Sequence, residues 1–202
     1  MDRLSDFLSR QIGIEPWIAS LIAIALVTLL VNQVAQFALR HAARASAKTS
    51  TVWDESLIES AGRPLLFALV VIGLGFMARV AQRQTEEPFL DQVLAVRDVA
   101  LIACGAWFLL RFIGKVGQHV VERKAESGED VDRTTVDALG KLARLVTVVV
   151  VPLETAQTMG FQITGLLALG GVGGLAVGLA AKDLLANFFG GLTIYLDRPF
   201  AV

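Results

Sequence analysis

The chain has 202 residues, of which 54% are hydrophobic and only 18% are charged, and its formal net charge is −1. Soluble globular domains carry about 25% charged residues, so this composition indicates a membrane protein. The balanced charge provides no basic surface for nucleic acid. A single cysteine, Cys104, excludes an internal disulfide and a paired-cysteine metal site. The two histidines, His41 and His119, are expected to lie in polar connections without a metal role.

The first predicted element is a membrane-spanning helix over Trp17–Leu39, which contains no charged side chain. A run of that length exceeds the ~20 residues that a helix needs to cross the hydrocarbon, and Trp17 suits the headgroup level. Residues 1–16 carry charges of both signs and no small-residue cleavage site follows the apolar run. We therefore expect no cleavable signal peptide.

Three shorter apolar segments follow, and each is predicted to span the membrane as a helix: Pro64–Ala78, Val99–Leu110 and Leu145–Met159. The first two are bracketed by charged residues, whose long side chains can snorkel to the interface and let short segments cross. The third contains Pro152 and Glu154, and its valine run would predict a strand in a soluble protein. In lipid an open strand leaves backbone groups unpaired, which favours a helix.

The connection before the fourth helix is polar. Gly128 is typical of a helix end, and Thr134 with Thr135 is typical of a helix start near the cytoplasmic surface. The same connection contains an acidic cluster, Glu126, Glu129, Asp130 and Asp132. This cluster lacks the ligand spacing of a calcium-binding loop, so we expect a solvated loop there.

The last uncharged run lies between Glu154 and Lys182 and is rich in glycine. Its segment Gly171–Ala176 fits the G-x-G-x-x-G/A dinucleotide pattern, but such a loop needs a preceding strand and surrounding water, and the upstream sequence is membrane. We instead predict a pore-lining helix over residues 161–182, because small residues let helix backbones approach closely in lipid. The predicted packing positions are Gly171, Gly174, Ala176 and Gly178. A tightly packed helix pair within one subunit is the alternative.

Two leucines on this helix are candidates for a pore seal. Leu175 and Leu179 are four residues apart and project from the same face. In a ring of identical helices they would form apolar constrictions that block ions by dewetting. The alternative is that both face lipid or another helix.

After Lys182 the sequence predicts a bend and then an amphipathic helix over residues 183–200, near the cytoplasmic interface. Candidate bend and pore-mouth residues are Lys182, Asp183, Asn187, Gly190 and Gly191, and the interface end is Arg198, Pro199 and Phe200. The whole chain is thus predicted to be an all-α membrane protein with five spanning helices. Lysine and arginine concentrate in the first and third connections, which places residues 1–16 in the periplasm and the C-terminus in the cytoplasm.

The motif residues follow one another in a specific order: Gly171-x-x-Gly174-Leu175-Ala176-Val177-Gly178-Leu179-Ala180, then Leu185-x-Asn187, Gly191 and Arg198-Pro199-Phe200. This combination resembles the pore helix of the small-conductance mechanosensitive channel (MscS) family. The five predicted helices and the AKDLLANFFGG segment resemble its larger, low-conductance members. Upstream of about residue 130 the similarity is only in layout. Three-helix members commonly have glycine where this chain has Asp183, so Gly190 and Gly191 are competing hinge positions.

The resemblance implies a homoheptamer in the bacterial inner membrane that membrane tension opens, releasing ions and small osmolytes on hypo-osmotic shock without a cofactor. It implies that residues 17–130 form peripheral transmembrane helices 1–3, that residues 131–160 form a tension-sensing paddle in contact with membrane lipids, and that Leu175 and Leu179 form the seal. It also implies a cytoplasmic domain after residue 202.

Two other functions compete with this interpretation. A secondary transporter would use Glu154 beside Pro152 in a broken helix as its coupling site, but the chain shows no internal repeat. A non-conducting membrane anchor for a cytoplasmic domain is the other alternative. The sequence contains no arrangement typical of a hydrolase, a zinc peptidase or a nucleotide-binding enzyme, so no enzymatic activity is expected.

Overall fold

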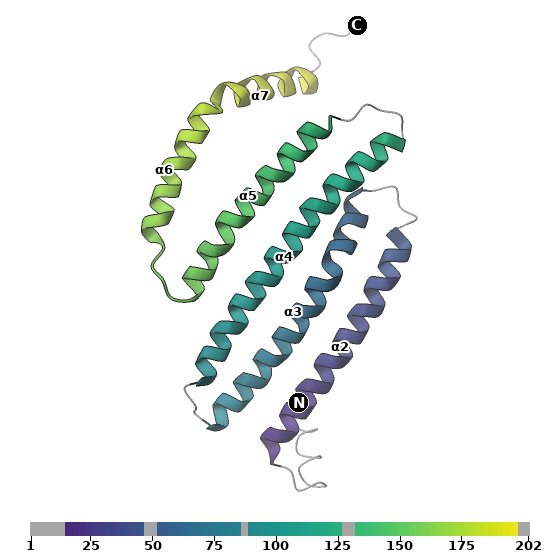
Figure 1. Cartoon of the computed structure of the whole chain (residues 1–202), viewed down its shortest axis with the longest axis vertical. Helices are drawn as coiled ribbons and strands as arrows, with labels where there is room; N and C mark the ends of the chain where they lie inside the picture. Colours follow the sequence, from purple (N-terminus) through teal and green to yellow (C-terminus); the bar gives the residue numbers. More distant parts are fainter. Residues whose placement is uncertain (1–14, 47–51, 86–88, 127–131, 198–202) are drawn as a thin grey trace. The chain divides into compact units, whose positions relative to one another are not determined.

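The computed structural model describes residues 15–46, 52–85, 89–126 and 132–197, and within them the only regular elements are α-helices (Figure 1). The helices are α2 (Pro16–Ser46), α3 (Val52–Thr85), α4 (Phe89–Glu126), α5 (Arg133–Thr158), α6 (Thr164–Ala180) and α7 (Lys182–Asp197). The chain divides into two units, residues 1–160 with α2–α5 and residues 161–202 with α6 and α7. The absence of strands in the described residues agrees with the predicted all-α class.

Helices α2–α5 form a single layer in chain order. Among the described residues, α2 packs on α3, α3 on α4 and α4 on α5, and no other pair in this unit touches (Figure 1). Such a layer has almost no interior: among its described residues the only buried hydrophobic ones are Ala19 and Ala78, while Leu26 is 63% and Leu30 is 64% exposed. Apolar surface of this extent is untenable in water but ordinary in lipid. The arrangement therefore agrees with the predicted membrane location.

Two glycines of α3 bring neighbouring helices close together. A side chain at Gly73 would overlap Thr28 of α2, and a side chain at Gly75 would overlap the aliphatic part of Arg97 on α4. Small residues at such positions are the usual means of helix packing in lipid, where apolar burial does not drive association. The sequence analysis did not single out either glycine.

Pro64 lies inside α3, whereas we expected a helix to begin there. A proline removes the backbone hydrogen bond to the carbonyl four residues earlier, which here belongs to Ser60. Nearby, Arg111 of α4 donates from its guanidinium to the carbonyl oxygen of Glu59 over 3.2 Å. This interhelical bond supports the backbone of α3 next to the position that Pro64 disrupts.

Three helices, α2, α3 and α4, are long and apolar enough to cross a membrane, and α6 with α7 would make a fourth span if the bent pair counts as one. The chain is therefore a multi-pass membrane protein. The predicted spans at residues 17–39, 64–78 and 99–110 lie within the first three helices. In contrast, α5 is too charged to be counted with them. Every stretch of 18 residues within it contains Lys141, Arg144 and at least one of Asp137 and Glu154. Its crossing at residues 145–159 stays a prediction.

The predicted polar connections are largely helical, which corrects the expectation for both histidines. His41 lies in α2, stacked on Phe37 with ring centroids 6.2 Å apart, and His119 lies in α4. In α4 the charged residues beyond Leu110 keep helical spacing and contact α3, as Lys115 does with Glu59. Gly128, Glu129 and Asp130 lie outside the described residues, so the expected helix end is not addressed.

Helix α5 begins at Arg133, close to the predicted start. Its cap is Asp132, whose carboxylate accepts hydrogen bonds from the Thr134 backbone N–H at 3.0 Å and the Thr135 hydroxyl at 2.5 Å. These bonds stabilise the charged form, and the Thr135 hydroxyl has the largest effect, so the pKa of Asp132 is lowered. Two members of the predicted acidic cluster are thus not loop residues, because Glu126 is the last residue of α4 and Asp132 is a helix cap.

Candidate functional site

The predicted pore residues all lie on one helix, α6. Leu175 and Leu179 are each 65% exposed in the single chain and share one helical face. A side chain built at Gly171, Gly174 or Gly178 would meet no other atom within 4 Å. The glycine positions of α6 are therefore open surface in one chain.

The composition of α6 weakens it as an isolated helix. Six of its 17 residues are glycine, and each glycine costs about 1 kcal/mol relative to alanine in a helix interior. A lipid environment offsets part of this loss of helix stability, because backbone groups in lipid must form their hydrogen bonds within the helix. Glycines so placed are useful when another backbone approaches them, so the composition favours a helix that packs closely against a partner.

The helix bends at Ala181, between α6 and α7, by 57°. Backbone bonds continue through the bend, since Ala181 N–H donates to the Val177 carbonyl at 2.9 Å and Leu185 N–H donates to the Ala181 carbonyl at 3.0 Å. Lys182, Asp183 and Asn187 lie in the first turns of α7, where the helix dipole favours a carboxylate such as Asp183. The other two hinge candidates, Gly190 and Gly191, lie inside α7.

The predicted interface end, Arg198, Pro199 and Phe200, lies outside the described residues. Upstream of α6, the two units of the chain join at Gly160. Its φ is +87°, a conformation that suits glycine, and its N–H donates to the Gln157 carbonyl at 2.9 Å. Gly160 thus ends α5 as a C-terminal glycine.

A ladder of polar contacts joins α3 to α4. We call it the charge ladder and define it as Glu55, Ser56 and Glu59 of α3 with Arg111, Lys115, His119 and Arg123 of α4. Lys115 Nζ lies 2.7 Å from a Glu59 carboxylate oxygen, and an Arg123 guanidinium nitrogen lies 3.9 Å from Glu55. Between them the fully buried Ser56 hydroxyl lies 2.8 Å from His119 Nδ1.

The ladder contains the one group of described residues with metal-binding composition, Glu55, Glu59 and His119, whose ligand atoms lie within 4.8 Å of one another. Both carboxylates already face a cation, Lys115 or Arg123. We therefore interpret this group as a contact between α3 and α4 in which positive and negative charges are paired, and not as a metal site.

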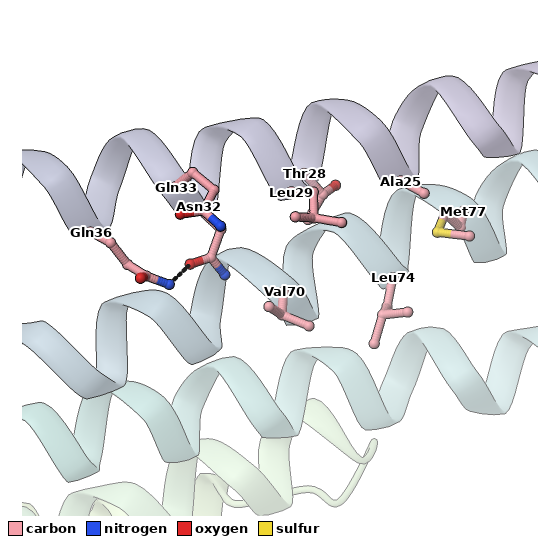
Figure 2. Close-up of a pocket in the computed structure, with 10 residues that line it drawn as sticks. Ala25, Thr28, Leu29, Asn32, Gln33, Gln36, Val70, Leu74 and Met77 are labelled. Carbon is pink, nitrogen blue, oxygen red and sulfur yellow. Dashed lines mark hydrogen bonds between the residues drawn. The ribbon is translucent and has the colours of Figure 1, made fainter.

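Amide side chains line a hollow of ≈ 340 Å³ between α2 and α3 (Figure 2). Asn32, Gln33 and Gln36 of α2 line it together with apolar residues of α3 such as Val70 and Leu74 (Figure 2). Gln36 donates to the Asn32 side-chain oxygen at 3.2 Å, and Asn32 donates to the Leu66 carbonyl at 3.4 Å. These amides lie within the span Trp17–Leu39, for which the sequence analysis noted only the absence of charge.

Comparison with known proteins identifies the segment that contains α5 and α6. Residues 141–182 match the family model "Mechanosensitive ion channel, transmembrane helices 2/3". The chain carries an MscS-family membrane portion. This match confirms the resemblance inferred from the pore-helix motif, and it includes Leu175, Leu179 and the three glycines predicted to be packing positions.

Curated relatives agree with that assignment. The chain is 38% identical over 81 residues to the low conductance mechanosensitive channel YnaI of Escherichia coli, covering 40% of this chain and 23% of that protein. It is 30% identical over 197 residues to the large-conductance mechanosensitive channel MscMJLR of Methanocaldococcus jannaschii, covering 92% and 52%. An MscS family protein of Aquifex aeolicus is 30% identical over 182 residues, covering 89% and 48%.

The chain thus spans about half or less of the length of these relatives. No solved structure matches it significantly. Similarity over 92% of the chain to one relative extends well upstream of residue 130, where the sequence analysis found only a similar layout.

Sequence reasoning missed the charge ladder and the amide hollow, although both leave signals. Arg111, Lys115, His119 and Arg123 recur every four residues, the spacing that places side chains on one helical face. The amides Asn32, Gln33 and Gln36 were overlooked because only charged residues were counted when the spans were predicted. Intramembrane polar residues nevertheless need a partner, so they are worth locating.

Proposed function

We propose that this chain is the membrane part of a mechanosensitive ion channel that membrane tension opens, letting ions and small osmolytes leave the cell on hypo-osmotic shock. The observation that carries the proposal is the match of residues 141–182 to the channel family's transmembrane helices, which include α6 with its open glycine positions. Relatives named as mechanosensitive channels support it. In this proposal the chain is a channel without enzymatic activity or a cofactor.

In this proposal α6 lines the pore of a ring of identical subunits, a heptamer by family resemblance. Gly171, Gly174, Ala176 and Gly178 are the positions where neighbouring copies of α6 approach one another, since small residues allow backbones to come close in lipid. Leu175 and Leu179 then point at the axis. Two stacked apolar rings would exclude water and ions while the pore is narrow, and widening under tension would hydrate them.

The remaining helices surround the pore. Five spans, including α5 as the tension-sensing paddle over residues 131–160, would place the N-terminus in the periplasm and the C-terminus in the cytoplasm of a bacterial inner membrane. Helix α7 would then lie at the cytoplasmic interface, with Lys182, Asp183, Asn187, Gly190 and Gly191 near the pore mouth and Arg198, Pro199 and Phe200 at its end. A cytoplasmic domain would follow residue 202.

The test is single-channel recording under suction from membranes of cells that lack other mechanosensitive channels and express the full-length protein. We expect conductance steps that appear only above a threshold tension. Survival of the same cells after hypo-osmotic shock is the second readout. Substrate-dependent flux without tension would instead indicate a transporter, and a protein that never conducts would indicate a membrane anchor.

Gly174→Leu provides a specific check on the pore assignment, with Gly62→Leu in α3 as the matched control. Both glycines are free of neighbours within 4 Å in the single chain. If α6 packs against its copies, Gly174→Leu will alter assembly or threshold tension while Gly62→Leu leaves both unchanged. Equal behaviour of the two variants would remove α6 from the subunit contact.

A further inference from the structure

Three amides of α2 lie inside the segment that crosses the hydrocarbon. With Thr28, the middle of the uncharged run, at the bilayer centre, Asn32, Gln33 and Gln36 lie about 6, 8 and 12 Å from it at 1.5 Å per residue. All three depths fall within the ~15 Å half-thickness of the hydrocarbon core. Asn32 and Gln36 bond to one another, but Gln33 is exposed and has no hydrogen-bond partner within the part of the chain that the structure describes.

The two sides of the α2–α3 contact differ in polarity. One side is the amide hollow of ≈ 340 Å³ (Figure 2). The other side is a hollow of ≈ 430 Å³ whose lining, apart from Thr28, is apolar.

The α4–α5 contact repeats this asymmetry. On one side is a hollow of ≈ 540 Å³ with polar and charged lining residues of both signs, Gln118, Glu122, Arg133, Asp137 and Arg144. On the other side a hollow of ≈ 340 Å³ is lined by apolar residues, including Phe112, Val116, Val120 and Leu139.

The two polar hollows open on the same face of the layer. In α2, Thr28 lines both hollows of its contact, Val27 only the apolar one and Leu29 only the amide one. In α4, Ile113 lines both hollows of its contact, its predecessor Phe112 only the apolar one and its successor Gly114 only the charged one.

Helices α2 and α4 run in the same direction, because one antiparallel helix separates them, and each meets the next helix of the chain on the same side (Figure 1). A right-handed helix turns about 100° per residue, so the successor of the contact residue lies on the same face in both helices. The layer therefore has a polar face, defined by the amide and charged hollows, and an apolar face, defined by the two apolar hollows.

We infer that the polar face of the α2–α5 layer is covered by a second copy of this chain, while the apolar face meets lipid. Acyl chains cannot satisfy the Gln33 amide, whereas a protein surface can, and an unsatisfied amide in hydrocarbon is costly. Within the hydrocarbon the amides supply donors and acceptors, and beyond the predicted span of α4 the charged hollow supplies both signs of charge, so the face suits a protein surface of mixed polarity. This inference rests on the proposed function, because the proposed ring is what places copies side by side.

The inference can be tested by site-specific photo-crosslinking in native membranes with the full-length protein. A benzophenone amino acid is placed at Gln33 or Leu29 on the polar face, and at Val27 or Val31 on the apolar face as matched controls. All four positions are exposed in the single chain, so each variant is expected to fold. We expect severalfold more adducts of two chains from the polar face, and lipid adducts from the apolar face.

Lipid adducts at Gln33 and Leu29 equal to those at Val27 and Val31 would overturn the inference, as would adducts confined to one chain or formed with an unrelated protein. Tension-evoked currents from the same variants distinguish a failure of the inferred contact between copies from a failure of the proposed channel function. Currents without two-chain adducts at the polar face would refute the inference and leave the proposed function standing. Two-chain adducts without currents would leave the inference standing and refute the channel.

Discussion

The contact between Gly73 and Thr28 allows a sharp prediction about how the layer holds together. We expect Gly73→Ala to loosen α2 from α3, because the new methyl group would overlap three atoms of Thr28. One of them is the Thr28 β-carbon, which the new carbon would approach to 2.9 Å and which no rotation of the side chain can move. The Thr28 hydroxyl is also held, since it donates to the Ile24 carbonyl at 2.7 Å.

The magnitude follows from two opposing effects. Replacing glycine by alanine inside a helix gains about 1 kcal/mol of helix propensity. Forcing extra atoms into a packed contact costs typically about 1–3 kcal/mol. Gly62→Ala in the same helix meets no neighbour within 4 Å, so it shows the gain alone. The difference between Gly73→Ala and Gly62→Ala is therefore expected to be about 1–3 kcal/mol.

The assay is unfolding of the purified protein by SDS in mixed micelles, followed by helix content and α2–α3 proximity. Gly75→Ala should fall between the two variants, because its methyl group would meet the flexible part of Arg97. Thr28→Ala should partly rescue Gly73→Ala, since it removes two of the three overlapping atoms. Equal stability of Gly73→Ala and Gly62→Ala would show that α2 does not pack on α3 at this point.

Three further predictions concern the pore and the start of α5. Leu175→Ser should hydrate the proposed seal and lower the threshold tension in patch recordings, and an unchanged threshold and leak would place the seal elsewhere. The lowered pKa of Asp132, due mainly to the Thr135 hydroxyl, implies stabilisation that is present above about pH 4 and lost as the pH falls through the folded-state pKa. Asp132→Asn keeps the cap without the titration, so its thermal stability should lose this pH dependence, and an unaltered pH profile would contradict the assignment. If Lys182 pairs with Asp183 of the next subunit, each charge reversal should shift gating and the double reversal should restore it, whereas additive shifts would make Lys182 a pore-mouth charge.

The first three spans and helix α6 were predictable because both depend on local composition. Trp17–Leu39 lacks charge over a length that suffices to cross a bilayer, whatever the tertiary structure. The glycine-rich part of the motif, Gly171–Ala180, likewise lies within α6, and the family match over residues 141–182 includes it. Helix ends were less predictable. Charged residues such as Arg111 and Lys115 were taken to end a span, yet they continue α4, because leaving the hydrocarbon does not require leaving the helix.

The contacts between helices were not predictable from one sequence, since they depend on which faces meet. The sequence around Gly73 does not distinguish it from Gly62. Yet a side chain at Gly73 would overlap Thr28, whereas a side chain at Gly62 would meet no other atom within 4 Å. His119 looked like a lone residue until the structure placed Ser56 beside it. The bend of the predicted pore helix had two candidate positions in the sequence, and the structure has it at Ala181, where no glycine is needed.

A layer one helix thick suits the proposed response to tension. Among the described residues of this unit, each helix touches only its chain neighbours, so a change in lateral pressure would act on every helix of the layer. Contacts such as Gly73 with Thr28 and the charge ladder oppose separation of the helices, so the layer would transmit force instead of dispersing. The chain then passes through Gly160, whose positive φ ends α5 before α6 begins. In the proposed channel, the stiffness of this connection would set how much of the force on the layer reaches α6 along the chain.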